Sequence, residues 1–595
     1  MGSVSMSRIR LYAPFLALIA VQGFLVAIAP SAAPPSGDQA AFDGGSPEDG
    51  SFSSGPTGGG DGEFDVEGQA LDDADGDGPT FGDTDGTSGG GGAAGGGSGG
   101  TDGATGTEGN GDASGSGDDG EQVQAESGGT SHCTSDGRQH DVFPTAPECR
   151  PVFAGDNGGA TYAGVDADEV RVLWFMEDSN EQVDALIEQA GVGASPEDQQ
   201  EFFEAVEDFL NDHYEFYGRE VTITRHVAEG CPQSPPDIPS CRAAARQAVE
   251  QFDPFIIVWP TPIYPDVFDE FAREQVITFG GWHVDRRVFE TRRPFRWDLN
   301  MDGTTTMDFV GEYYCKKLAG DNASNSGEII HPTIGTRGNV ERRLGIVSRE
   351  HEQNLSTAQR LQAVVADCTD ETPPIVTYDP DLGRRQEQAT TNTANLIDQG
   401  VTTVVCVCDP IHPVFETLAY TRQGYFPEHL VAGMGFMDVD DVARLYDQQQ
   451  WQHAFGLSHV GDAVPEEEED PQTIWEAAGR DGERPCPCGL EAAYPLVVGA
   501  MIHNAGPDLN PRTVERGMFE APSVGGWQDS GGDPTSVMVS FSEGDYTAIS
   551  DVREVYWDTE ATSASDGDSG AYVSLYEGER FTRGNLRSSF DVPQP

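Results

Sequence analysis

The sequence predicts an α/β protein with two doubly wound parallel-sheet lobes, preceded by an N-terminal apolar helix and a disordered tether. From about residue 160, short apolar segments alternate with helical segments, which is the pattern of βαβ units with strands buried on both faces. The alternation restarts near residue 344. Two similar lobes are therefore expected, each with helices on both faces of its sheet.

The first 35 residues are predicted to be a targeting segment. Arg8 and Arg10 precede an apolar run over 11–29. As a helix this run would rise about 28 Å, close to the roughly 30 Å of a bilayer's hydrocarbon core. The basic residues lie on its N-terminal side, so the rest of the chain is expected outside the cell. A cleaved signal peptide and an uncleaved anchor that holds the protein at the membrane both fit this segment.

Residues 36–130 are predicted to form a disordered linker. The segment is rich in Gly and Asp, and no Lys or Arg occurs between Arg10 and Arg138. Such a chain cannot bury enough apolar surface to offset its conformational entropy, and its like charges keep it extended.

The charge of the whole chain excludes one class of partner. It has 34 basic and 101 acidic residues, with a formal net charge of −67. Nucleic-acid binding requires a cationic surface, so we expect no nucleic-acid partner.

The first βαβ run begins with the apolar strand 170–176. A helix containing Phe202, Phe203, Val206, Phe209 and Leu210 on one face follows it. The remaining elements of the run are expected to be strands at 220–225, 255–259 and 276–279, with helices over 241–251 and 265–274.

The second run repeats this order. We expect strands at 344–349, 374–378, 402–408 and 429–434, with helices over 356–365, 386–399 and 413–423. Periodicity and length distinguish the buried strands from the helices in both runs.

Residues directly after the strands are the candidates for ligand binding, because ligands of open α/β sheets bind beyond the carboxyl ends of the strands. Thr261 and Asp409 each precede a proline and also fit the role of helix N-caps. The candidate ligand-binding residues are Glu177, Asp178, Trp259, Thr261, Gly281, Trp282, Glu350, His351, Asp409 and Phe436.

Catalytic motifs are missing from the sequence. It contains no G-x-G-x-x-G after the first strand, no P-loop and no H-E-x-x-H. The run Gly567-Asp568-Ser569-Gly570 resembles a serine-protease loop, but no upstream His and Asp accompany it in a suitable fold. We therefore expect no enzyme activity, no cofactor and no metal.

All ten cysteines lie at or beyond Cys133, which suits disulfides in an extracellular protein. This position also excludes a lipid-modified cysteine at the end of a signal segment. The expected pairs are Cys133 with Cys149, Cys231 with Cys241, and Cys315 with Cys368. Cys406, Cys408, Cys486 and Cys488 form two C-x-C pairs, for which disulfides and a thiolate zinc site both remain open.

Several stretches resemble the type I periplasmic solute-binding proteins of branched-chain amino-acid ABC transporters, in an actinobacterial form. They are 157–165 before the first strand, Arg293-Pro294-Phe295-Arg296-Trp297, 493–510 with its AGPD end, Val555-Tyr556-Trp557-Asp558 and Gly570-Ala571-Tyr572. The resemblance covers about residues 133–585. The long tether and the missing lipid-attachment cysteine depart from the family's usual layout.

The resemblance implies two lobes that close around a solute. It places chain crossings near Phe295, 455–465 and 535–550, with lobe 1 formed by 131–298 and 463–540 and lobe 2 by 299–462 and 541–595. The implied function is capture of an amino acid or amide-like solute for an ABC permease, at the extracellular face of the membrane. A membrane-tethered ligand-sensing ectodomain on the same fold is the alternative.

Overall fold

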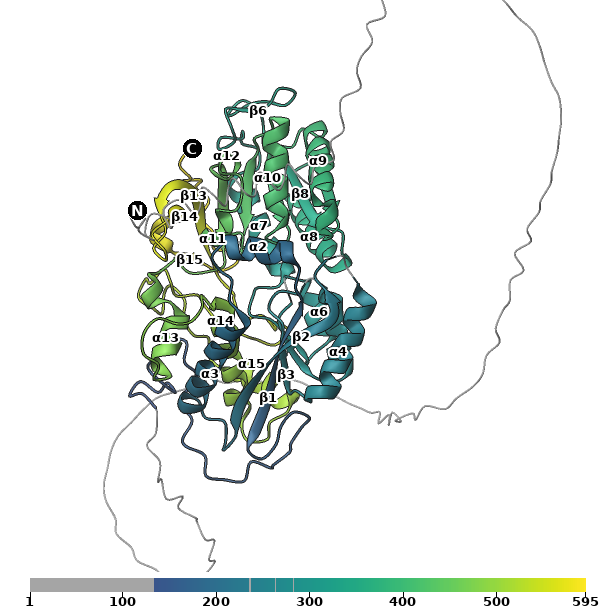
Figure 1. The fold of residues 1–595 in the computed structure, drawn as a ribbon. Helices are drawn as coiled ribbons and strands as arrows, with labels where there is room; N and C mark the ends of the chain where they lie inside the picture. The colour runs from purple at the N-terminus through teal and green to yellow at the C-terminus, as the bar shows by residue number, and fades with distance from the viewer. Residues whose placement is uncertain (1–132, 235–236, 263, 282, 595) are drawn as a thin grey trace, which may run out of the picture. The chain divides into compact units, whose positions relative to one another are not determined.

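The computed structural model describes residues 133–234, 237–262, 264–281 and 283–594 (Figure 1). The predicted targeting segment 1–35 and linker 36–130 lie outside the described residues. Within the described chain, no helix combines the length and the apolar character that crossing a membrane requires.

The first lobe is built on a parallel sheet with the strand order β2-β1-β3-β4-β5. Its strands are β1 (Glu169–Asp178), β2 (Glu220–Pro232), β3 (Ile256–Val258), β4 (Ile277–Phe279) and β5 (Arg296–Trp297). The last of these falls in the segment that the sequence indicates as a crossover between lobes, and it adds a strand to the predicted run.

The two faces of β1 pack into different cores. Val172 and Trp174 contact one core, whereas Leu173 and Phe175 contact the other. Helix α3 (Pro196–His213) covers the first face and α4 (Ile238–Phe252) the second, on opposite sides of the sheet (Figure 1). Burial on both faces explains why the strand is apolar throughout instead of alternating.

The other helical segments of this lobe come from two parts of the chain. The N-terminal part contributes α2 (Glu181–Gln189), η1 (Pro265–Val267), α5 (Phe268–Arg273) and α6 (Arg286–Thr291). The C-terminal part contributes η2 (Glu466–Glu468), α13 (Asp470–Ala477), α14 (Gly489–Ala505) and α15 (Pro511–Glu520). Residues of α13, α14 and α15 share a core with α3.

The second lobe is built on a mixed sheet with the order β14-β13-β12-β11-β10-β8-β9, and β15 also pairs with β13. Its parallel part contains β8 (Leu344–Arg349), β9 (Ile375–Tyr378), β10 (Thr403–Val407), β11 (Glu428–Ala432) and β12 (Ala454–Ser458). An antiparallel extension follows, formed by β13 (Val552–Thr562), β14 (Ser569–Ser574) and β15 (Arg580–Phe581).

Helices cover this second sheet as they cover the first. They are α7 (Gly303–Lys317), α8 (Glu352–Cys368), α9 (Leu382–Asp398), α10 (His412–Gln423), α11 (Asp440–Ala443) and α12 (Gln448–Trp451). A small hairpin of β6 (Ile329–His331) and β7 (Gly335–Thr336) precedes β8, and a 3₁₀ turn η3 (Tyr576–Gly578) precedes β15.

Within the described residues, the chain crosses between the lobes three times, after β5, after β12 and before β13. The first and third crossings are joined by backbone hydrogen bonds: Ala548 N–H donates to Asp298 O at 3.0 Å, and Ile549 N–H donates to Leu299 O at 3.1 Å. Ala548 packs in the core of the first lobe and Ile549 in that of the second. The predicted fold class, two α/β lobes joined by crossings, is confirmed.

Disulfides join cysteines within each lobe. The pairs in the described chain are Cys133–Cys149, Cys231–Cys241, Cys315–Cys368, Cys406–Cys408 and Cys486–Cys488. Each C-x-C motif is therefore closed on itself.

Candidate functional site

The candidate ligand-binding residues of the first lobe differ in how exposed they are. Trp259 is 1% exposed and stacks on Phe268 with ring centroids 5.0 Å apart. Its indole N–H donates to Glu177 Oε2 at 2.9 Å, and Glu177 is itself buried. Trp259 thus lies in the core of the first lobe, and Glu177 connects that core to the end of β1.

The remaining first-lobe candidates follow the ends of their strands. Asp178 is exposed, Thr261 is half-buried and Gly281 is buried. Trp282 lies outside the described residues.

The second-lobe candidates also occupy different environments. Glu350 is exposed, and its backbone N–H donates to Tyr378 O at 2.8 Å. Phe436 is half-buried and has a positive φ of 56° in the turn after β11. His351 reaches the first lobe, where its Nε2–H donates to Asp266 Oδ2 at 2.7 Å.

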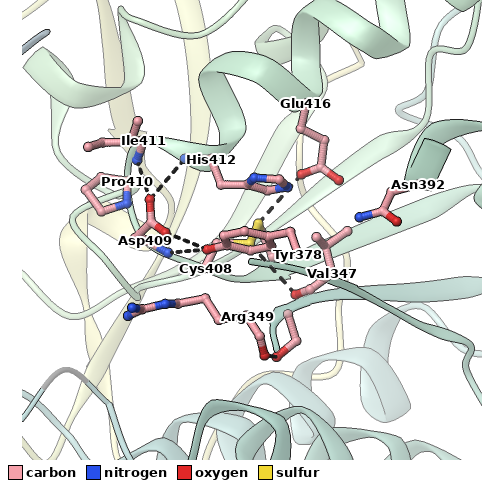
Figure 2. The surroundings of a disulfide bond; sticks show 12 residues. Val347, Arg349, Tyr378, Asn392, Cys408, Asp409, Pro410, Ile411, His412 and Glu416 are labelled. Carbon is pink, nitrogen blue, oxygen red and sulfur yellow. Dashed lines mark hydrogen bonds between the residues drawn. A yellow bond between two sulfur atoms is a disulfide. The ribbon is translucent and has the colours of Figure 1, made fainter. Parts of the chain in front are cut away.

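Asp409 organises the loop between β10 and α10 (Figure 2). Its carboxylate accepts hydrogen bonds from Arg385 Nη1 at 2.6 Å and Tyr378 OH at 2.7 Å. It also accepts the backbone N–H groups of Ile411 and His412, both at 3.1 Å. These bonds use the carboxylate within the second lobe, where it fixes the turn that leads into α10. The N-cap residue of that helix is Ile411, so Asp409 does not hold the N-cap position that its place before a proline predicts.

The residues around Asp409 keep its carboxyl group ionised. Burial raises the pKa of the carboxyl, but the positive charges of Arg385 and Arg349, with hydrogen bonds from Arg385 and Tyr378, bring the pKa well below its usual range. His412 stacks on the Tyr378 ring at 3.5 Å, and burial lowers its pKa to about 3. The imidazole is therefore neutral at physiological pH.

The strand ends of the two lobes meet. Asp266, in η1 of the first lobe, accepts hydrogen bonds from His351 and from Gln353 Nε2 at 2.6 Å, both in the second lobe. His283, after β4, accepts the N–H of Gly435 from the second lobe at 3.4 Å. The loops that the sequence nominates are thus the loops that face each other, and in this structure the lobes are in contact.

Arg296 and Asp298 at the first crossing are site residues that the loop argument did not nominate. Both are 0% exposed. Among the described residues, Arg296 Nη2 and Asp298 Oδ2 have no hydrogen-bond partner. A Cβ on Gly281 would lie 3.0 Å from that oxygen and 3.6 Å from that nitrogen. A side chain at Gly281 would therefore press on an unused donor, an unused acceptor and the Phe289 ring, which would lie 3.2 Å from the added Cβ.

Burial also shifts the pKa values of Asp298 and Arg296. It raises the pKa of the Asp298 carboxyl to about 7 and lowers the pKa of Arg296 to about 10. The arginine remains charged at neutral pH. The signal in the sequence is the pair of charged residues in the run Arg296-Trp297-Asp298, since charged side chains are rarely fully buried unless they are paired.

Charged groups of one lobe influence an ionisable group of the other: Arg349 of the second lobe acts on Tyr264 of the first, which also lies near Glu177. Burial raises the pKa of the Tyr264 hydroxyl, the charge of Glu177 raises it further, and the charge of Arg349 from the second lobe opposes the shift. Arg349 is 2% exposed, and its charge also lowers the pKa of Asp409. The interface between the lobes is thus a polar, charge-bearing site.

One cluster in the described chain has the composition of a metal site. Ligand atoms of Cys406, Cys408 and Glu416 lie within 4.8 Å of one another. The two sulfurs are joined as a disulfide (Figure 2), and a disulfide does not supply the thiolate ligands that zinc prefers. We therefore assign no metal to this cluster.

Known proteins similar to this chain are found among solved structures. No family model and no curated protein matches the chain. Among solved structures, a solute-binding protein of an ABC transporter from R. palustris, in complex with 4-hydroxybenzoate, is 12% identical with a TM-score of 0.48, covering 70% of this chain and 98% of that chain.

Two further solved structures are similar to this chain. A possible leucine/isoleucine/valine-binding protein from Rhodopirellula baltica has 10% identity and a TM-score of 0.46, covering 69% of this chain and 98% of that chain. A fatty acid ABC transporter substrate-binding protein from Thermomonospora curvata has 10% identity and a TM-score of 0.47, covering 71% and 94%. The ligand that each of these structures binds belongs to that protein.

Proposed function

We propose that this protein captures a small polar solute between its two lobes, outside the cell, and presents it to an ABC permease. The observation that carries the proposal is the contact between loops that follow strands of the two sheets, made by Asp266 with His351 and Gln353 and by His283 with Gly435. A solute that touches both walls binds the closed form better than the open form, and only that difference drives closure. The proposal includes no catalytic step.

The site favours a solute that offers both a donor and an acceptor. Asp298 Oδ2 is available to accept and Arg296 Nη2 to donate, and Gly281 lies between them without a side chain. Amino acids and primary amides carry both functions on adjacent atoms. The low polarity of a buried site strengthens such bonds, so this pair would select polar solutes.

The proposal is tested by a thermal-shift screen with L-amino acids, primary amides, urea and polyamines, followed by calorimetry on any compound that raises the Tm. Gly281→Ala places a methyl group against Asp298 and Arg296. Since losing one charge-assisted hydrogen bond costs roughly 1.5–3 kcal/mol, we expect affinity to fall about tenfold or more.

Gly383→Ala is the matched control, because its added methyl group meets a single atom at an ordinary distance of 3.4 Å. Equal affinity in both variants would show that the solute does not occupy the space at Gly281. A screen in which no member of these compound classes stabilises the protein would exclude a polar solute of this kind.

A ligand-sensing ectodomain is the second candidate. The 36–130 linker and the lack of a cysteine before Cys133 favour it, because both depart from the usual lipid-anchored importer component. Co-purification of a permease and an ATPase with the detergent-solubilised protein would support import, whereas co-purification of a signalling protein would support sensing.

A further inference from the structure

A cavity lies between the lobes, apart from the site at Gly281. Its volume is about 820 Å³, and none of the ten candidate ligand-binding residues is among the described residues that line it. The walls come from α13 and α14 of the first lobe, from 438–441 and Tyr572 of the second lobe, and from the crossings at 460–464 and 535–541. Any molecule held there contacts both lobes and the hinge.

The inner wall of this cavity is apolar. Phe143 and Ile549 are buried at 5% and 8% exposure, and Leu496, Val497 and Val539 are half-buried. A volume of this size is within the range that holds a small organic molecule. The apolar side chains would accept a hydrocarbon or aromatic body.

Carboxylates surround this apolar wall. Among the described residues that line the cavity, Arg553 is the only basic one, and it is already bound to Asp462 and to the carbonyls of Val460 and Gly461. The acidic lining residues are Glu148, Asp438, Asp440, Asp441, Asp462, Glu468, Glu469, Asp470 and Asp533.

Part of this negative charge is unbalanced. Glu469 pairs with Arg484 at 2.7 Å and Asp441 with Arg444 at 2.8 Å. For Glu468 and Asp470, by contrast, the described residues supply no side-chain hydrogen bond or ion pair. Burial, together with the neighbouring Asp566 and Asp440 and against the opposing charge of Arg444, raises the pKa of Asp441 to about 6.

A buried hydroxyl adds a polar group that the protein leaves unused. Ser536 lines the cavity and is 8% exposed, and its Oγ has no hydrogen-bond partner in the described part of the chain. An unsatisfied buried polar atom is costly, so native structures usually satisfy it with a water or a ligand. The cavity therefore combines an apolar wall, a surplus of negative charge and an unused hydroxyl.

We propose that this cavity is a second binding site, which takes an amphiphilic cation: an apolar or aromatic body that carries an ammonium or guanidinium group. The body packs on the wall of Leu496 and Val539, and the cation lies against Glu468 and Asp470. Because both lobes and the crossings form the walls, occupancy favours one arrangement of the lobes and thereby changes affinity at the first site.

The test uses three probes with the same aromatic body: phenethylammonium, 2-phenylethanol and phenylacetate. Calorimetry on the full chain should show binding of the cation, at least tenfold weaker binding of the neutral alcohol, and no binding of the anion. Binding should weaken as salt rises, since the attraction is electrostatic. Equal binding of the three probes, or no binding of the cation, would overturn the proposal.

Substitutions of the acidic residues that line the cavity test where the cation binds. The double variant Glu468→Gln/Asp470→Asn should weaken phenethylammonium at least fivefold, and folding should persist because both side chains are exposed. Glu467→Gln is the matched control: it lies in the same turn, is exposed and does not line the cavity. Loss of cation binding in Gly281→Ala, with no effect of the double variant, would place the cation at the first site and reject a second one.

Discussion

At the scale of single residues, the interface between the lobes contains buried ionisable groups. Burial shifts the pKa values of these groups. Asp298 has a pKa raised to about 7, and His283 a pKa lowered to about 4, both mainly because burial disfavours the charged form. His283 remains neutral, donates from Nδ1 to Met301 O at 3.1 Å and accepts from Gly435 with Nε2. One neutral histidine thus connects a crossing with the opposite lobe.

The carboxyl of Asp298 should make stability depend on pH. Its pKa in the folded protein exceeds the ordinary 3.8, so the folded state holds a proton that the unfolded state releases. The stability that this proton supplies is complete below about pH 4 and is lost as pH rises towards 7. Relative to Asp298→Asn, the wild type should lose about 2–3 kcal/mol of unfolding free energy between pH 5 and pH 8.

Urea unfolding at both pH values measures this difference. Asp178→Asn, which changes an exposed carboxylate, is the control and should leave the pH dependence as it is in the wild type. An Asp298→Asn variant with the pH profile of the wild type would mean that the folded protein does not hold this proton.

At the scale of elements, the described disulfides differ in how much chain they enclose. Cys315–Cys368 joins α7 to α8 across a sequence separation of 53, whereas Cys406–Cys408 closes a separation of 2 at the end of β10. The α7–α8 pair packs in the core of the second lobe, so its connection constrains a large part of the unfolded chain.

Removing these two disulfides should therefore have unequal effects. Loop-closure entropy predicts a loss of about 4 kcal/mol for Cys315→Ala/Cys368→Ala, against about 1.6 kcal/mol for Cys406→Ala/Cys408→Ala. Chemical unfolding of the two double variants without reductant provides the comparison. A larger loss for the second variant would show that local packing around Glu416 and Tyr420 outweighs chain entropy.

At the scale of the whole molecule, side-chain hydrogen bonds join the facing strand ends of the two lobes. Asp266 accepts hydrogen bonds from both His351 and Gln353 of the second lobe, and its side chain is 30% exposed. Partly exposed polar contacts contribute little free energy each. An equilibrium between open and closed forms should thus be sensitive to this one residue.

Asp266→Ala should shift the ligand-free protein towards an open form. Small-angle scattering should show a larger radius of gyration than in the wild type, and the variant should unfold at nearly the same urea concentration. Asp269→Ala is the control, because Asp269 pairs with Arg292 inside the first lobe at 2.6 Å. If Asp269→Ala opened the protein as much as Asp266→Ala, loss of charge rather than loss of the contact would be responsible.

The sequence alone determined the two runs of strands and helices, because burial on both faces makes each strand a continuous apolar segment and leaves helices amphipathic. It also indicated which loops meet, since parallel strands end at one edge of a sheet. The two-residue strand β5 was not predicted, because so short a segment has no period of its own.

Only the tertiary structure decided how the individual side chains are used. Trp259 belongs to the core and Asp409 to its own loop, whereas Arg296 Nη2 and Asp298 Oδ2, beside Gly281, have no hydrogen-bond partner among the described residues. Whether a polar atom is satisfied depends on neighbours far away in the sequence: Asp409 is bound by Arg385 and Tyr378, and Asp298 faces α14 through Tyr494 OH at 3.3 Å. Local pattern contains no information on such distant partners, because they are brought together only when the lobes fold.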